Sequence, residues 1–520
     1  MKLNLNKWWY NMNEQPITAP SIWDRSSSVR FFLWLFSWRG IRRVLIVLAW
    51  MATIIALFIG EENWRGRRAW NQYRQATEAR GESLDFAAYV PKPVPDDRNF
   101  AATPFLGSFF QPGISILTND LFARAADYIP GSKHEQDKSP RQFVDLVAWQ
   151  MASAALRSGP LKAGQQFKTD QAGLAARAAA APAIMEGMQP DAAVFAELRA
   201  ASAREFSRYP VKYDLENPWA ILLPHLGLTE MVCNRLKLQA CAELVAGQAS
   251  QALSDVKLIL SLADSFKSEP FLISALVRLR FVDQIAIQPV WEGLAEHRWT
   301  DAQLQELQAR FLSYDFPADL QQSLKVERAC GILAVDLVKK QGIGRFILSG
   351  WLCQEKLNYC TLFDAQRKGV VDLEAKTISP DKVASNSDEL TRQIYGGNQL
   401  KALLHHRAIA AMMLPALNRV EAKVAAAQTA ADQAALACAL ERYRLANGQF
   451  PETLEALTPQ FISRPPNDAI TGQPYKYRRS ADGQYILYSV GWNEKDDGGV
   501  PGKSLFDQSQ GDWVWSYPTQ

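Results

Sequence analysis

The pattern of hydrophobic positions begins with an uncharged apolar run near the N-terminus, VLIVLAWMATIIALFIG, which covers Val44 to Gly60. Arginines precede this run and two glutamates follow it directly. Its seventeen residues lie at the short end of the range that spans a bilayer, and Ile41 with a snorkelling Arg43 extends it. The run predicts a single transmembrane helix over residues 41–60, which stays uncleaved because no small-residue cleavage site follows.

The charges around this run predict its orientation. Lys and Arg are equally frequent in the two flanking segments, but the three arginines closest to the run, Arg39, Arg42 and Arg43, all precede it. Positive charge close to a span favours the cytoplasmic side, so we expect the N-terminus in the cytoplasm and the body outside. The aromatic segment from Phe31 to Trp38 is too short to span and is expected to lie in the membrane interface.

A mixed stripe of apolar and charged residues follows the span. It predicts that the helix continues outward as a stalk, from about Asn63 to Glu82. The alternating prolines at positions 91, 93 and 95 then forbid a helix and favour an extended linker. The strong core patterns begin later, so we expect residues 61–98 to lie outside the body and a fragment lacking residues 1–98 to fold.

Helical periodicity dominates the chain from about Ile116 to Leu400. Thr300 and Gln303 have the spacing of a capping box before a run with apolar residues at helical intervals. Apolar spacing also predicts two helices that turn at Gly247, like one unit of a helical-hairpin repeat, although no regular period follows. The pattern therefore predicts an irregular α-helical domain.

The pattern changes after about residue 400. A long helical stretch, broken near Pro415, carries small residues at three-four spacing, which lets a neighbouring element pack closely. Beyond Asn447 and Gly448 come two runs with strand character, QPYKYRRS and QYILYSVGW. Asp482 and Gly483 stand between them, the residue pair that favours a tight hairpin turn. A long helix and a small antiparallel sheet are expected here.

These patterns predict a mainly α-helical protein with a C-terminal α+β domain. A chain of 520 residues is too long for one ordinary core, so several domains are expected. In chain order we expect a cytoplasmic tail with an interfacial segment (1–40), a transmembrane helix (41–60), a stalk and proline-rich linker (61–98), an α-helical domain (99–398) and an α+β domain (399–520).

Composition narrows the classes of function. The formal net charge is only +3, and no dense basic run occurs outside the membrane flank. A protein that neutralises phosphates needs such charge, so no nucleic-acid partner is expected. Two of the six cysteines, Cys353 and Cys360, flank a stretch with no clear pattern. A bridge in an oxidising compartment and two separate thiols are both consistent with this spacing.

Motifs for catalysis are incomplete. His134 and Glu135 begin a zinc-protease pattern, but Lys138 stands where the second histidine is required. The segment GGVPGKS is similar to a phosphate loop, yet Asp497 occupies its first glycine position. Scattered carboxylates are then the remaining candidate catalytic residues in the helical domain.

The clearest chemical cluster is the loop WNEKDDGGVPGKSLFDQSQGD, which begins at Trp492. It is rich in glycine and carries Asp496, Asp497, Asp507 and Asp512. Hard oxygen donors on a flexible loop suit Ca²⁺, which accepts six to eight oxygen ligands. A solvated acidic loop is the alternative interpretation.

A family resemblance bears on this loop. ALERYRLANGQFPETLEAL, with the strand runs and the later GDWVW, resembles the globular part of type II secretion major pseudopilins. That family places a long helix against a small antiparallel sheet and ends in a loop that can bind calcium. The resemblance implies Asp497 and Asp512 as ligands, with Asp496 and Asp507 as candidates by proximity. This chain departs from the family because no prepilin-type cleavage signal precedes the helix, so assembly into a pilus is not expected.

The middle of the chain carries a second resemblance. The segments that begin RGRRAWNQYRQATEARG and SEPFLISALVRLRFVDQ resemble membrane-anchored proteins of planctomycete and verrucomicrobial bacteria, which implies a bacterial envelope location. We therefore expect a structural or interaction protein of the inner membrane, with its body in the periplasm. It would contact the lipid bilayer through residues 41–60 and bind a protein partner, with a link to secretion or pilus-like machinery. The alternative is an envelope hydrolase, which a deep pocket with convergent acids of shifted pKa would favour.

Overall fold

The structure is a computed structural model, and it describes residues 26–111, 121–129, 141–162, 164–169, 173–340, 348–396, 402, 405–503 and 510–517. The chain divides into two compact units. Residues 1–68 with 348–351 form the first unit, and residues 69–347 with 352–520 form the second. The structure is mainly helical, as the sequence patterns predict.

The first unit contains α2 (Ser27–Leu35) and the first part of α3 (Trp38–Ala79). The Ser37 hydroxyl accepts a hydrogen bond from the Gly40 amide at 3.1 Å and so caps the start of α3. Among the described residues, α3 is the one helix long and apolar enough to cross a membrane, which agrees with the predicted span. Its exposed large apolar side chains are Leu45, Ile46, Val47, Leu48, Trp50, Met51, Ile54, Ile55, Leu57 and Phe58.

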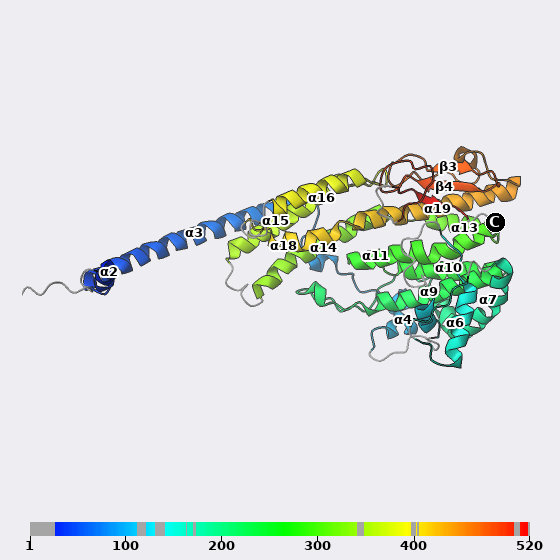
Figure 1. The fold of residues 1–520 in the computed structure, drawn as a ribbon, viewed down its shortest axis with the longest axis horizontal. Helices are drawn as coiled ribbons and strands as arrows, with labels where there is room; N and C mark the ends of the chain where they lie inside the picture. The colour runs from blue at the N-terminus through cyan, green and yellow to red at the C-terminus, as the bar shows by residue number, and fades with distance from the viewer. Residues whose placement is uncertain are drawn as a thin grey trace, which may run out of the picture. The chain divides into compact units, whose positions relative to one another are not determined.

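The second unit is a bundle of helices, shown in Figure 1, with one main hydrophobic core and smaller core clusters beside it. Its longer helices are α6 (Leu146–Ser158), α7 (Leu174–Met188), α8 (Ala192–Ala201), α9 (Pro224–Val245), α10 (Ala249–Asp264), α11 (Leu272–Arg280), α12 (Ile287–Ala295), α13 (Asp301–Leu312), α14 (Phe316–Lys340), α15 (Ser349–Arg367, with its first turn in the other unit), α16 (Pro380–Tyr395) and α19 (Val420–Asn447).

Short helical segments join these helices. They are α4 (Pro104–Ser108), α5 (Leu121–Ala125), α18 (Ala408–Met413), the 3₁₀ turns η2 (Phe86–Tyr89), η3 (Asp96–Arg98), η4 (Phe100–Ala102), η5 (Ala126–Tyr128), η6 (Gln189–Asp191), η7 (Pro218–Ala220), η10 (Leu414–Leu417) and η11 (Leu454–Leu457), and a π-helical segment, η8 (Phe281–Ala286).

The long helix α19 is the centre of this unit. It packs against α11, α12, α13 and α14 and also contacts the C-terminal strands, so most of its surface is covered. Alanine is the commonest residue at its buried positions, and such small side chains let neighbouring helices approach closely. The main hydrophobic core runs continuously from Leu84 to Trp515 and therefore crosses the expected domain boundary between residues 398 and 399.

Several local predictions are confirmed in this unit. Gly247 has φ of +77° and lies between α9 and α10, where a left-handed conformation favours glycine. Thr300 and Gln303 form the capping box that begins α13. The break near Pro415 separates α18 from α19 and is occupied by η10.

The C-terminal sheet has three antiparallel strands in the order β3 (Lys476–Arg479), β4 (Tyr485–Ser489) and β5 (Trp513–Trp515). Arg479 pairs with Tyr485 across the predicted hairpin, and Gly483 has φ of +83° in the turn. A separate two-stranded ribbon joins β1 (Val371–Asp372) to β2 (Thr377–Ile378). A long helix with a small antiparallel sheet is therefore present in this part of the chain.

Much of the expected stalk packs on the body. Residues 69–98 belong to the second unit, and Tyr73 donates a hydrogen bond to Asp364 at 2.7 Å. Glu82 is ion-paired to the buried Arg328, and Phe86, which is 1% exposed, packs in a core cluster with Val326. The expectation that the core begins after residue 98 was wrong, because these side chains contribute contacts that only the folded chain brings together.

The expected irregular stretch between Cys353 and Cys360 is also wrong. Both residues lie on α15, seven positions apart on one continuous helix. Two turns of helix separate their Cα atoms by about 10 Å, beyond the span of a disulfide. A bridge between these two cysteines is therefore excluded by the helix.

Candidate functional site

The acidic C-terminal loop places two of the four predicted calcium ligands together. The Asp512 carboxylate, which is nearly fully buried, accepts hydrogen bonds from the Asp497 amide at 3.2 Å and from the Gly499 amide at 2.6 Å. The Asp497 carboxylate in turn accepts from the Gly511 amide at 2.9 Å. Burial raises the pKa of Asp512, and the neighbouring carboxylates add to the rise. These carboxylates therefore close the loop by accepting backbone N–H donors.

The third predicted ligand, Asp496, makes different contacts. Its carboxylate accepts hydrogen bonds from the Gly498 amide and the Tyr488 hydroxyl, both at 3.0 Å. Lys476 lies 3.4 Å from its other oxygen. The Gly498 amide is the main cause that lowers the pKa of Asp496. A carboxylate held by a lysine is a poorer cation ligand, because the ammonium already supplies its positive partner.

Calcium binding at this loop stays a prediction. Asp507 lies outside the described residues. Within the described part of the chain, no three carboxylate, imidazole or thiol side chains are grouped so that they could hold a metal ion. The described loop therefore supplies two adjoining carboxylates, Asp497 and Asp512, and no complete ligand set.

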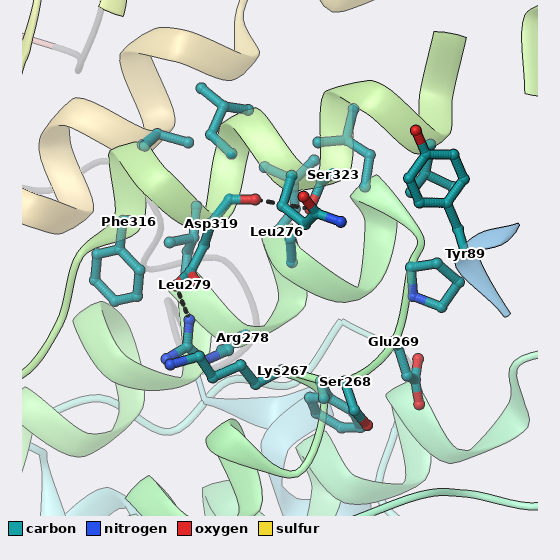
Figure 2. A pocket seen from close by; sticks show the side chains of 18 of the residues that line it. Tyr89, Lys267, Ser268, Glu269, Leu276, Arg278, Leu279, Phe316, Asp319 and Ser323 are labelled. Atoms are coloured by element: carbon teal, nitrogen blue, oxygen red, sulfur yellow. Dashed lines mark hydrogen bonds and ion pairs between the residues drawn. The ribbon is translucent and has the colours of Figure 1, made fainter. Parts of the chain in front are cut away.

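A cavity of about 360 Å³ lies in the second unit between α11 and α14 (Figure 2). Its walls are mainly apolar and include Leu272, Leu276, Leu279, Leu320 and Val326. The segment between α10 and α11 closes one side with Lys267, Ser268 and Glu269, and Tyr89 comes from η2. The apolar spacing of α11 and α14 explains the walls, because each helix presents one apolar stripe to the other.

Glu269 is a buried acid of this cavity whose carboxylate contacts two other side chains. Its carboxylate lies 2.5 Å from Nε2 of His225 and accepts a hydrogen bond from the Ser274 hydroxyl at 2.5 Å. His225 is fully buried, with its ring 4.3 Å from the Tyr209 ring and 5.2 Å from the Phe110 ring between centroids. The histidine and the serine both contact the carboxylate, so the imidazole is not placed to activate the serine hydroxyl.

Arg278 is the second charged group at the cavity. Its guanidinium donates to Asp264 at 2.9 and 3.0 Å and is ion-paired to Asp319. It also lies over two rings, with the guanidinium carbon 5.2 Å from the Tyr314 centroid and 5.4 Å from the Phe316 centroid. The two carboxylates raise the pKa of Arg278 against the opposing effect of burial. The positive charge of Arg278 is therefore already paired with carboxylates of the protein.

Several acids with a strongly raised pKa lie elsewhere. Burial raises the pKa of Asp432 on α19 to about 7 and that of Glu243 on α9 to about 8. Asp255 on α10 is also raised by burial, and it raises the pKa of Glu243 further. These three acids are absent from the walls of the cavity. The acids with raised pKa values described here therefore do not converge on this cavity.

The cavity is suited to hold an apolar group. Its two buried acidic and basic centres are already paired, and its remaining surface is mainly apolar, although Lys267, Ser268, Gln322 and Ser323 also line it. The sequence patterns did not single out Glu269, His225 or Arg278. Their partners lie 41 and 44 residues away along the chain, so no local spacing signals the contacts.

No family model, curated protein or solved structure matches this chain. The function proposed below therefore rests on the sequence and geometry of this chain.

Proposed function

We propose that the protein is a membrane-anchored structural or interaction component of the bacterial envelope. The single observation that carries this proposal is the exposed apolar surface of α3 between Leu45 and Phe58. A helix with large aliphatic side chains exposed on all its faces needs an apolar solvent, and about twenty such residues match the hydrocarbon core of a bilayer. In this proposal residues 41–60 hold the chain in the inner membrane, and the arginines that precede Val44 favour a body in the periplasm.

An interaction role fits the body better than the alternative of an envelope hydrolase. Glu269 is engaged by His225 and Ser274, and Asp319 is engaged by Arg278, so neither acid of the cavity is available as a general acid or base. An apolar cavity with balanced charges supports binding of an apolar segment of a partner.

The pseudopilin resemblance supports a link to secretion machinery without polymerisation. A helix that assembles into a filament must present an apolar face to its neighbours. In this chain α19 is covered by α13, α14 and the sheet, and its buried residues already serve the core. We therefore propose a partner for the assembled body and not for α19 alone.

The proposal is tested by crosslinking in intact cells. A photoreactive residue is placed at Leu276, in the cavity wall, and at the exposed Leu445 of α19 as a matched control. Membranes are extracted with alkaline carbonate before detergent solubilisation. We expect the protein to remain in the carbonate-resistant fraction, and a crosslinked product to form from position 276 and not from position 445. Release by carbonate would contradict anchoring, and the absence of a product specific to position 276 would contradict the interaction role.

A further inference from the structure

The segment before α9 exposes large apolar side chains. Leu215 and Trp219 are each 50% exposed and Leu222 is 81% exposed, whereas large apolar residues of the same unit mostly lie in the core. These three residues belong to the loop 214–223, which includes η7 and projects beyond the start of α9 (Figure 1). An apolar loop of this kind marks a surface that meets another apolar phase.

Hydrogen bonds within the loop and buried residues beneath it hold the loop in one conformation. The Asp214 carboxylate accepts hydrogen bonds from the Glu216 and Asn217 amides, both at 2.9 Å. Pro218 is buried, and Ile221 packs on the core cluster around Phe86. The exposed side chains are thus presented by an ordered frame, which reduces the entropy lost when they bind.

Contacts within the second unit show at which end of it the loop lies. Trp70, one residue after the point where α3 enters the unit, lies 5.8 Å from the Lys356 ammonium. Lys356 also contacts Asp336 of α14 at 2.7 Å. One helical turn further along α14, Lys340 pairs with Glu216 of the loop at 2.7 Å.

A second set of contacts, farther along both helices, shows in which direction α14 runs beside α3 in this unit. Tyr73 and Arg328 both contact Asp364, whereas Trp70 and Asp336 share Lys356. Within this unit α14 therefore runs antiparallel to residues 70–79 of α3, so that Lys340 lies toward the N-terminal end of that part of α3. The loop therefore lies at the end of the unit where the chain leaves toward the apolar run.

Distance and charge both suit a lipid surface. The ten residues of α3 from Gly60 to Trp70 rise only about 15 Å, so a short tether joins the apolar run to the second unit. The polar layer of each leaflet is about 5–8 Å thick and takes up part of this length. Three exposed lysines, Lys212, Lys339 and Lys340, stand against two exposed acids, Asp214 and Glu216, which leaves little net positive charge, so insertion of apolar side chains outweighs attraction by charge.

We propose that the loop 214–223 inserts Trp219 and Leu222 into the interface of the same bilayer that α3 spans. The partner is the lipid surface itself, and Trp219 is the residue type that favours this depth. This second contact would hold the body against the membrane. It rests on the proposed anchoring by residues 41–60.

The test uses the full chain reconstituted in phosphatidylcholine vesicles. In a Cys353→Ser background, a fluorescent thiol probe is placed by Leu222→Cys, by Leu445→Cys as an exposed control, or by Thr53→Cys within the apolar run. Nitroxide lipids then report which probe lies in the bilayer. We expect the probe at 222 to lose most of its fluorescence and the probe at 445 to keep it, with no change when salt is raised. Trp219→Ser should reduce the loss at 222.

The outcomes separate the two proposals. Quenching at 53 without quenching at 222 would overturn membrane contact by the loop and leave the anchoring intact. No quenching at 53 would overturn the anchoring as well. Quenching at 222 that appears only with anionic lipid and disappears in high salt would show charge attraction and overturn insertion.

Discussion

Two long helices of this protein meet their surroundings in opposite ways. Between Leu45 and Phe58, α3 directs Leu, Ile, Val, Trp and Phe outward, and its large apolar side chains are roughly half exposed or more. In α19, most positions are buried, and alanines predominate among them. Both helices are poor in charge on much of their surface, yet only one finds its apolar partner within the protein.

Polar residues show why the two helices differ. Buried Gln428 of α19 accepts a hydrogen bond from the Phe316 amide at 2.9 Å, and Gln433 donates to the Trp513 carbonyl at 2.7 Å. Asp432 accepts from the Tyr475 hydroxyl at 3.0 Å. Such groups are stable only where a protein neighbour satisfies them. The exposed run of α3 carries no such anchor, which is the pattern expected for a helix surrounded by lipid.

The largest expected effect comes from shortening the chain from its N-terminus to two different points. Removal of residues 1–68 takes away the exposed run, and we expect the remaining chain to be soluble and folded. Removal of residues 1–98 also deletes Tyr73, Glu82 and Phe86, which pack on the body. Loss of a buried Phe alone costs about 3–5 kcal/mol, a large part of a total stability of about 5–15 kcal/mol.

Size-exclusion chromatography and circular dichroism of the two fragments make this measurement. The longer fragment should elute as a folded species and the shorter should aggregate. Equal folding of both would show that residues 69–98 are an independent stalk.

A second prediction compares buried and exposed leucines of α19. Leu436 is fully buried and Leu445 is 45% exposed. Leu436→Ala should lower the free energy of unfolding by about 2–5 kcal/mol, because it leaves a cavity among close-packed helices. Leu445→Ala should change it by less than about 0.5 kcal/mol. Urea unfolding of the detergent-solubilised protein, followed by tryptophan fluorescence, gives both midpoints, and equal midpoints would contradict the central position of α19.

A third prediction concerns how protonation of Asp432 makes the stability of the folded protein depend on pH. Burial raises the pKa of this carboxyl to about 7 in the folded protein, above its unfolded value of about 3.9. The folded state therefore keeps a proton that the unfolded state has released, and stability falls as pH rises through this window. The loss is up to about 4 kcal/mol between about pH 4 and pH 7. Asp432→Asn should flatten this part of the stability profile, whereas Asp482→Asn, at an exposed turn, should leave its slope unchanged.

The smallest expected effect is that of calcium on the C-terminal loop. Calcium at a hundredfold excess over its Kd should stabilise the native state by about 2.7 kcal/mol and raise Tm. Asp497→Ala and Asp512→Ala should each abolish this calcium-dependent rise, and Asp482→Ala should not. Magnesium should do less, because it requires a tighter octahedral shell. A calorimetric titration without heat would identify the loop as an acidic turn closed by its own backbone.

The features that sequence reasoning predicted correctly depend on neighbours in the chain. The turn at Gly247, the capping box of Thr300 and the hairpin at Asp482 and Gly483 are each specified within a few residues. The long apolar helix that contains residues 41–60 is likewise specified by a contiguous pattern. Such features need no knowledge of the tertiary fold.

The features that were missed depend on distant partners. Residues 69–98 join the body through Asp364 and Arg328, which lie more than 240 residues away. Glu269 in the cavity is recognisable only once His225 is beside it. A single sequence carries no local signal for these pairings.

The most direct test of the account is the topology of α3. A reporter that is active only outside the cytoplasm is fused after Gln520 in one strain and near Asp24 in another. If residues 41–60 span the inner membrane with the N-terminus in the cytoplasm, the first fusion is active and the second is silent. Activity of the fusion near Asp24, or equal activity of both fusions, would contradict the anchored orientation on which the proposed function depends.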